Sequence, residues 1–504
     1  MKWLAMINLI DLPLATASQI LPLHILLPLL LAIICFLVKS SSISRWLSIV
    51  TAIIHLLFAV LLVSLAVSQN GAVISYAIGG WEAPLGISLT LNTFSAIMLI
   101  MSATISLAIT IYSGHYFKDV DQARRFWPLW WLLNTALCGI FLSGDLFNLY
   151  VMLELMGLSG VSLIAINKSQ SAIKAAYQYL LVGLFGSLLF LFGVALIYRE
   201  YGVLDLIMLA ATVQGTLLTK CALGFMSLGL ILKTALYPLH FWLPDAHASA
   251  PAPVSAALSA LVLKGTFYIL FMLWFSVLTP ATTFIGASII GAFGALAILW
   301  GSVKAFTTDK LKLLVAYSTV AQVGYLFILF PLMYQYPTKT LGAAAYFIVA
   351  HACAKAVMFM AVGNIQKIAG HDEIKRLSGI ASHMPLSIFI FGIAGISLMG
   401  LPPTGGFIAK WIMFDSALES KQWWWIIFLV VGGLLSASYL FRVLNLAFTT
   451  PTIEQEVYVS SSAEVGLLSA LVLAVITIVI GLNAMWILDV IDIGLATATL
   501  GTGK

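Results

Sequence analysis

Four ionisable side chains lie inside stretches of this sequence that are otherwise almost entirely hydrocarbon. They are Glu154, Lys233, Lys264 and Lys410. Each lies within an apolar run long enough to cross a bilayer, where an ionised group costs about 2.5–3.5 kcal/mol on insertion scales. Such residues line an ion path, pair with one another, or do both. One acid and three amines on four separate spans therefore predict a relay for protons or cations.

A relay of this kind requires titratable groups. Burial disfavours the ammonium form of a lysine and the carboxylate form of a glutamate, whereas an oppositely charged neighbour restores both charges. A lysine so placed takes up or releases its proton according to where its neighbours are. Arginine is unsuitable because its guanidinium stays protonated. Asp145, nine residues before Glu154, is explained equally well by helix capping and by ion uptake.

Four further residues are candidates for supporting roles. His351 and Lys355 lie four residues apart on one helix face, where they extend the relay or satisfy a neighbouring carbonyl group. His240 and His247 flank an interruption of a span. His247, close to Asp245, is either a group through which protons reach the relay or a capped loop residue.

The composition places these residues in a polytopic membrane protein. Of the 504 residues, 62% are hydrophobic and 9% are charged, whereas a soluble domain has about 25% charged residues. Lipid offers no partners for backbone polar groups, so spans must be helices or a closed barrel. The apolar runs exceed about 18 residues and lack two-residue alternation, which excludes a barrel. The predicted fold class is all-α.

The apolar segments predict about fourteen transmembrane helices, the first of them retained and not cleaved as a signal peptide. Lysines and arginines of the connections are unequally distributed: fourteen, including Lys312, fall on one side and six on the other. The poorer side includes Lys2 and Lys504 at the termini. By the positive-inside bias the richer side is cytoplasmic, so both termini are expected to face outward.

Two spans contain helix breakers beside a lysine. One reads Lys-Thr-Ala-Leu-Tyr-Pro from Lys233, and the other reads Gly-Leu-Pro-Pro-Thr-Gly-Gly from Gly400 and then reaches Lys410. Broken spans in corresponding places point to an inverted repeat with its ion site at the breaks. We therefore expect two five-helix units, helices 4–8 and 9–13, with helices 7 and 12 broken. The expected divisions are an N-terminal three-helix segment (1–125), the two repeats (126–278 and 279–450) and a C-terminal helix with its tail (451–504).

Cysteine usage and motif content predict a chain without metal or cofactor. The cysteines lie in apolar segments without CxxC spacing, which favours core residues with free thiols over metal ligands or disulfides; they are Cys35, Cys138, Cys221 and Cys353. The sequence contains no phosphate loop, haem motif or flavin fingerprint. We therefore expect no cofactor and no metal.

The charged positions lie in strings that resemble a known family. These strings are Gly144–Glu154, Leu232–His247, Val262–Lys264, His351–Lys355 and Gly400–Phe407. They are similar to the antiporter-like subunits of respiratory complex I and of Mrp multisubunit cation:proton antiporters, over nearly the whole chain. The resemblance implies fourteen helices, two inverted five-helix units with broken helices 7 and 12, and a Glu–Lys–Lys–Lys/Glu line through the middle of the membrane.

On that pattern Glu154 is the acid of helix 5, and Lys233 and Lys264 are the lysines of helices 7 and 8. Lys410 is the terminal group on helix 12. Within the family, the segment Gly79–Ile87 resembles the D-type subunit of Mrp complexes. Lys410 is compatible with that D-type subunit and argues against the complex I member that has a glutamate there.

The resemblance implies a secondary-transporter subunit, not an enzyme, in the cell membrane of a prokaryote. Its expected partners are other subunits of a hetero-oligomeric antiporter, protons, Na⁺ or another monovalent cation, and the lipid bilayer; no nucleic acid is expected. Two alternatives stay open. One is a proton-pumping subunit of a complex I-type NADH-quinone oxidoreductase or membrane-bound hydrogenase, and the other is an ion-coupled subunit of a bicarbonate-accumulating complex.

Overall fold

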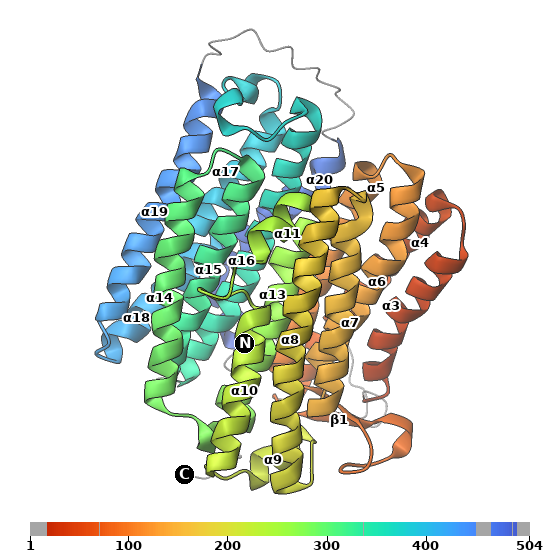
Figure 1. Cartoon of the computed structure of the whole chain (residues 1–504), viewed down its shortest axis with the longest axis vertical. Coiled ribbons are helices and arrows are strands. Elements are labelled where there is room, and N and C mark those ends of the chain that lie inside the picture. Colours follow the sequence, from red (N-terminus) through yellow and green to blue (C-terminus); the bar gives the residue numbers. More distant parts are fainter. Residues whose placement is uncertain (1–17, 70, 336, 450–464, 486, 491–504) are drawn as a thin grey trace.

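The computed structural model describes residues 18–69, 71–335, 337–449, 465–485 and 487–490, and these form a bundle of long helices (Figure 1). The helices of the N-terminal part are α3 (Ile20–Leu37), α4 (Ser41–Ser68), α5 (Thr93–Tyr116), α6 (Val120–Leu142), α7 (Leu146–Ile164) and α8 (Gln170–Tyr201). They are followed by α9 (Leu206–Thr212), α10 (Leu217–Lys233), α11 (Leu243–Ser249), α12 (Ala252–Ala257), α13 (Leu263–Met272), α14 (Phe284–Thr307) and α15 (Leu311–Met333). The last are α16 (Pro337–Ala369), α17 (Pro385–Met399), α18 (Gly405–Glu419), α19 (Trp424–Phe448) and α20 (Leu468–Leu482).

Fourteen helical segments of the described residues correspond to the fourteen predicted spans. Ten are long and apolar enough to span a membrane by themselves. The others are α6, the interrupted pairs α10–α11 and α17–α18, and the shorter α20. This arrangement confirms the predicted all-α polytopic fold. The termini, with Lys2 and Lys504, lie outside the described residues, so their outward orientation stays a prediction, as do the four sequence divisions.

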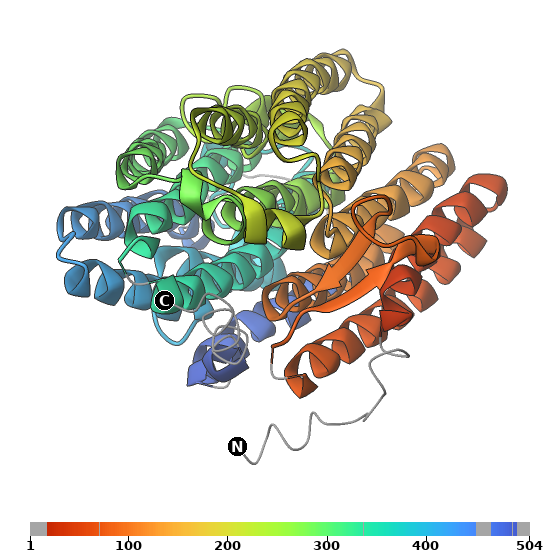
Figure 2. The ribbon, with the colours of Figure 1, turned by 90° about the horizontal axis from the view of Figure 1, so that it is seen from below.

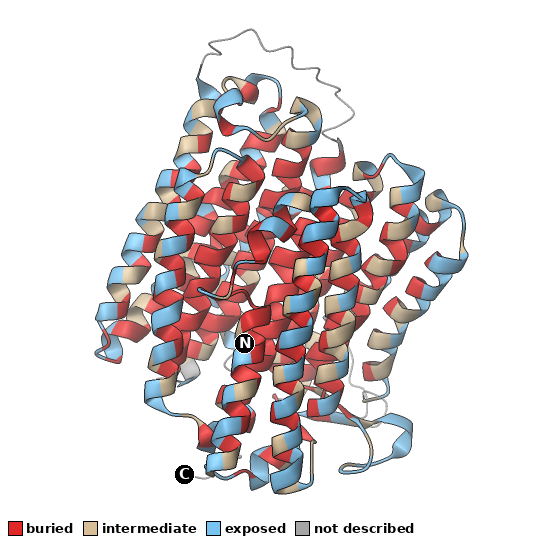
Figure 3. Ribbon diagram, viewed as in Figure 1, coloured by how far each residue is buried: buried red, intermediate tan, exposed pale blue. Residues whose placement is uncertain are grey.

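The bundle has its most buried helices in the middle. α3 and α4 lie at one edge and α18 and α19 at the opposite edge (Figures 1 and 2). In the apolar window of α16, 94% of residues are buried, against 33% in that of α19. Figure 3 shows the buried residues concentrated along the axis and the exposed ones around the periphery. The spans that carry the predicted lysines therefore surround an interior shielded from lipid.

A small β-hairpin covers one end of the bundle, which we call the hairpin end. Its strands, β1 (Ile74–Ala77) and β2 (Ser88–Leu91), pair antiparallel. Ser88 Oγ donates to Asp205 Oδ2 (2.6 Å), and the Gly144 amide donates to the Ser88 carbonyl oxygen (2.9 Å). The hairpin is thus bonded to the junction between α6 and α7 and to the start of α9.

The structure settles the role of Asp145 and the burial of the cysteines. Asp145 is the N-cap of α7, because its Oδ1 accepts a hydrogen bond from the Asn148 amide at 2.8 Å. The helix that carries Glu154 therefore begins at a capped, fixed point. The prediction that all four cysteines are core residues is wrong for Cys221, which is exposed on α10; the other three are buried.

Both predicted breaks are present and are bonded within the bundle. α10 ends at Lys233, and α17 ends at Met399, where Gly400 takes the left-handed conformation at φ 83°. Carbonyl groups at a helix end have no partner in their own helix, so other donors must satisfy them. The Leu232 carbonyl oxygen accepts from Trp242 Nε1 (3.1 Å), and that of Leu398 accepts from Gln322 Nε2 (3.1 Å).

Candidate functional site

Glu154 of α7 and Lys233, at the end of α10, form an ion pair inside the bundle. Lys233 Nζ lies 3.7 Å from Glu154 Oε1, and the two side chains are 6% and 21% exposed. Glu154 Oε1 accepts no hydrogen bond from any described residue. The lysine is therefore the group that balances the charge of this carboxylate.

Two threonine hydroxyls lead from the α10 break towards the next lysine. Thr234, directly after Lys233, has its Oγ1 3.0 Å from Thr266 Oγ1 on α13. Both threonines are fully buried. Thr266 follows Lys264 by two residues on the same helix, so a polar contact joins the two lysine-bearing segments through otherwise apolar surroundings.

Lys264 is fully buried in the middle of the bundle. Its amine donates to the carbonyl oxygen of Ser259, which lies in a π-helical turn at Leu258–Val262 between α12 and α13. Such turns are frequent at functional sites. Ser259 Oγ lies 2.9 Å from Thr319 Oγ1, so the same serine links the Lys264 segment to α15.

Lys355 and His351 continue the path on α16. The Lys355 amine donates to Ser318 Oγ of α15, and the lysine is fully buried. One turn earlier, His351 is buried, and neither of its ring nitrogens bonds to a described residue. His351 interacts electrostatically with Lys264, Lys355 and Lys410. The structure therefore places this histidine among three of the predicted lysines.

Lys410 of α18 is directed at the second break. Its Nζ donates to the carbonyl oxygens of Leu398 (2.8 Å) and Met399 (3.3 Å), the last residues of α17. It also lies over the Tyr325 ring, 4.3 Å from the ring centroid. The C-terminal end of a helix and the face of an aromatic ring both attract cations. The amine therefore points into the bundle, and its role as the terminal group of a relay stays a prediction.

The two histidines near the first break have different surroundings. His240 lies in the break, its ring centroid 5.5 Å from that of Tyr237, and is 8% exposed. His247 on α11 is fully buried and stacks on Phe359 of α16, with 4.7 Å between ring centroids. The alternative of a capped loop residue is therefore wrong for His247. A role for either histidine in proton uptake stays a prediction.

Lys312 is a buried residue, although the sequence pattern predicts that it lies in a cytoplasmic connection. That prediction is wrong, because its side chain is 3% exposed on the first turn of α15. Its amine donates to the carbonyl oxygen of Ala250 and lies 3.5 Å from that of Ala248, at the end of α11. Lys312 also interacts electrostatically with His247.

Lys312 and Lys410 thus occupy similar positions in the two interrupted segments. Lys312 of α15 donates to a carbonyl oxygen at the end of α11, and Lys410 of α18 donates to one at the end of α17. The sequence does contain one signal for the burial of Lys312. Thr319 follows it by seven residues, a spacing that places both side chains on one face of α15.

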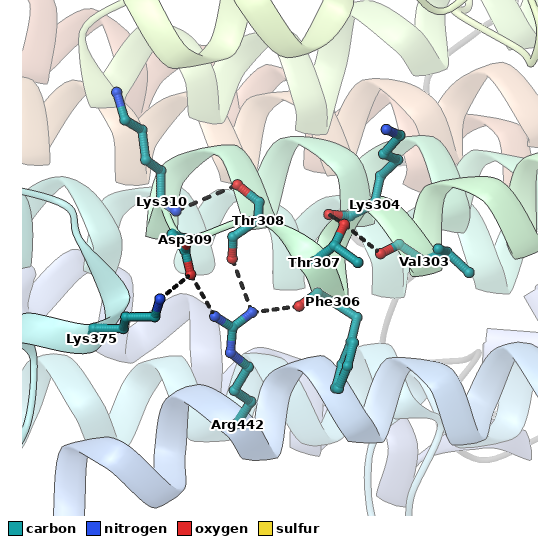
Figure 4. Close-up of polar contacts among 9 residues, drawn as sticks. All are labelled: Val303, Lys304, Phe306, Thr307, Thr308, Asp309, Lys310, Lys375 and Arg442. Atoms are coloured by element: carbon teal, nitrogen blue, oxygen red, sulfur yellow. Dashed lines mark hydrogen bonds and ion pairs between the residues drawn. The ribbon is translucent and has the colours of Figure 1, made fainter.

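A charged cluster holds the connection before Lys312 in place (Figure 4). Arg442 of α19 donates to Asp309 Oδ1 (3.0 Å) and to the carbonyl oxygen of Thr308 (2.9 Å). Lys375 lies 3.7 Å from the same carboxylate oxygen. These residues are at least partly exposed, so the contacts add little stability individually. Together they fix where α15 begins, and hence where Lys312 enters the bundle.

Comparison with known protein families gives two matches. Residues 143–436 match the family described as NADH:quinone oxidoreductase/Mrp antiporter, TM. Residues 78–127 match the family described as NADH-Ubiquinone oxidoreductase (complex I), chain 5 N-terminus. The first match contains all eight of the predicted relay residues.

The individual relatives include both oxidoreductase subunits and antiporter subunits. The NADH-quinone oxidoreductase N subunit of Desulforudis audaxviator is 35% identical over 77% of this chain and 80% of its own length. The Na(+)/H(+) antiporter D subunit of Bacillus subtilis is 27% identical over 93% of this chain and 95% of its own length. A chain in the solved structure of the membrane-bound sulfane sulfur reductase, an archaeal respiratory membrane complex, superposes with a TM-score of 0.87 at 26% identity, covering 95% of this chain and 98% of that one.

Proposed function

Since this chain belongs to the NADH:quinone oxidoreductase/Mrp antiporter family of proton-conducting membrane subunits, we propose that it is the D-type subunit of a multisubunit monovalent cation/proton antiporter. The observation that carries the proposal is the row of titratable groups from Glu154 to Lys410, which is half-buried at these two ends and buried between them. Protons move along this row, and the complex exchanges them for Na⁺ or another monovalent cation.

The first step of the proposed relay is the opening of the Glu154–Lys233 pair. At 3.7 Å the carboxylate stabilises the Lys233 ammonium ion. When the two groups separate, the buried ammonium ion loses that stabilisation and releases its proton. The Thr234–Thr266 contact provides a polar route towards Lys264.

The later steps rest on repulsion between neighbouring amines. Lys264 and Lys355 interact electrostatically, and His351 interacts with both of them. A proton that arrives on one of these groups therefore disfavours a proton on the next. At the end of the row, Lys410 holds its proton against two carbonyl oxygens and the Tyr325 ring until it passes to the bulk or to a neighbouring subunit.

Two observations favour the antiporter assignment. The D-type antiporter relative matches 93% of this chain, whereas the N-type oxidoreductase relative matches 77% of it. Lys410 is compatible with the D-type subunit and argues against the complex I member that has a glutamate there. The 35% identity to the N-type relative supports the second candidate, a proton-pumping subunit of a redox-driven complex.

The two candidates are separated by measuring transport without an electron donor. The native complex is purified through a tag on this subunit and reconstituted into vesicles with an imposed pH gradient. Under our proposal, added Na⁺, K⁺ or Li⁺ collapses the gradient in the absence of any redox substrate. A complex that moves protons only when NADH or another donor is oxidised would instead establish the second candidate.

Replacement of Lys264 by arginine tests whether this group must titrate. Arginine keeps the positive charge but cannot release its proton at accessible pH. We expect Lys264→Arg to be inactive at neutral pH, or active only at markedly raised pH, in vesicle proton-flux assays. Full activity at neutral pH would show that Lys264 supplies a fixed charge only.

A second test concerns the close approach of α8 to α10. A Cβ atom at Gly186 would lie 2.9 Å from the Gly229 carbonyl oxygen and 3.2 Å from Lys233 Cγ, whereas one at Gly183 would meet nothing within 4 Å. We expect Gly186→Ala to displace Lys233 and to reduce transport by roughly three- to tenfold. Gly183→Ala, one turn away on the same helix, is the matched control and should transport normally. Equal activity of the two variants would contradict this role for Gly186.

A further inference from the structure

Outside the relay, three metal-ligating side chains from three helices meet near the hairpin end. They are His24 on α3, His55 on α4 and Cys138 on α6, and their candidate ligand atoms all lie within 4.8 Å of one another. The two imidazole rings stack with 4.3 Å between centroids. Cys138 Sγ lies 3.8 Å from His55 Nε2. The three helices pack side by side at the N-terminal edge of the bundle (Figures 1 and 2).

The polar atoms of this cluster are buried and largely unbonded. His24 and His55 are 0% exposed and Cys138 is 1% exposed. Neither ring nitrogen of His24, nor Nδ1 of His55, bonds to a described residue. The surroundings are aromatic, with Phe58 edge-on to His24 and Trp131 edge-on to His55. Buried polar atoms in proteins normally have a partner. The unbonded nitrogens of His24, one of which lies within 4.8 Å of the Cys138 sulfur, therefore call for a ligand.

We propose that His24, His55 and Cys138 bind a soft monovalent metal ion of the Cu(I) class. For metal–sulfur and metal–nitrogen distances of about 2.3 and 2.0 Å at a trigonal angle of about 120°, the two ligand atoms are about 3.7 Å apart. The separation of Cys138 Sγ and His55 Nε2, 3.8 Å, matches this value. The rings of His24 and His55 are nearly parallel, with 11° between their planes, so His24 must turn its ring out of the stack to supply the third ligand.

Charge and ligand softness select the ion. On binding, the Cys138 thiol loses its proton to the bulk as the sulfur–metal bond forms, and both imidazoles bind in the neutral form. One thiolate and one monovalent cation give a site without net charge, which costs least where the ligands are fully buried among aromatic rings. A Zn²⁺ ion would leave one positive charge there and would need a fourth ligand. Thiolate ligands also favour Cu(I) over hard cations.

The site lies close to one end of the bundle and has an internal control. Both α3 and α6 contact β2, and His24 and Cys138 each lie about one turn from an end of their helix, whereas His55 lies midway along α4. Cys35 is another buried thiol of α3, and its Sγ lies 4.0 Å from Ser48 Oγ. It lies roughly 16 Å along the helix from His24, outside the cluster.

The test is metal retention by the purified native complex. Reduced complex is loaded with Ag⁺, a redox-inert substitute for Cu(I), desalted against a competing thiol and analysed for silver by mass spectrometry. We expect wild type and Cys35→Ser to retain equal amounts, and Cys138→Ser and His55→Gln to retain one equivalent less. Equal retention by Cys138→Ser and wild type would overturn the proposal, as would no retention by wild type.

Spectroscopy of the wild-type protein keeps the proposal testable if a variant fails to assemble. X-ray absorption of the Cu(I)-loaded complex should show one sulfur and two imidazole nitrogens around the metal. A shell of sulfur alone would contradict the assignment. Stoichiometric retention of Zn²⁺ but not Ag⁺ would contradict the monovalent class of the ion.

Discussion

Glu154→Gln should abolish cation/proton exchange while the complex still assembles. The amide has the same shape as the carboxylate but carries no charge, so the Lys233 ammonium ion loses its partner at 3.7 Å. We expect proton flux in everted vesicles to fall by roughly 100-fold or more, the scale on which positioned proton-transfer groups contribute. Lys233→Ala should have the same effect, because either change removes the first step of the relay.

The matched control is Glu200→Gln, which removes an exposed carboxylate near the end of α8. It should transport at the wild-type rate. Membrane levels of the subunit and its partners, measured in the same vesicles, separate a transport defect from an assembly defect. More than half of wild-type flux in either Glu154→Gln or Lys233→Ala would contradict the proposed first step of the relay.

Lys410→Ala should also reduce transport to background. The change removes the cation that bonds the carbonyl oxygens of Leu398 and Met399 and covers the Tyr325 ring. Lys410→Arg keeps the charge at the helix end but cannot release a proton, so it should assemble and still fail to transport. The measurement is Na⁺-dependent collapse of a pH gradient in vesicles.

Lys421→Ala is the control for this prediction. Lys421 is exposed in the turn between α18 and α19, and its removal should be nearly silent. Normal transport by Lys410→Ala would show that the relay ends elsewhere. Normal transport by Lys410→Arg would show that a fixed charge at the break is sufficient.

The fold was largely predictable because hydrophobic length and helix breakers are local signals. The fourteen apolar segments and both breaks lie where runs of about 20 residues and the Pro and Gly clusters place them. The positions of Glu154, Lys233, Lys264 and Lys410 were equally legible, since a charge within a span is conspicuous in the sequence. Their assignment to one family followed from the motifs around them, and the family match confirms it.

What the sequence did not reveal are contacts between distant segments. Lys312 reads as a loop residue because it follows Lys310 at the start of a helix, and its partner, Ala250, lies 62 residues earlier in the chain. For His247 the sequence left a capped loop residue and a proton-uptake group as alternatives, and it could not show that the ring packs on Phe359 of another helix. The cluster of His24, His55 and Cys138 has no recognisable spacing, because each ligand comes from a different helix.

The central claim is that Lys233 and Lys410 act in series on one proton path. The most direct test measures Na⁺-dependent proton flux, in vesicles containing the reconstituted complex, for Lys233→Ala, Lys410→Ala and the double variant side by side. Groups that act as one unit are not additive, so we predict that each single variant already falls to background and that the double variant is no worse. Substantial flux in each single variant, lost only in the double variant, would show two parallel paths and contradict a single relay from Glu154 to Lys410.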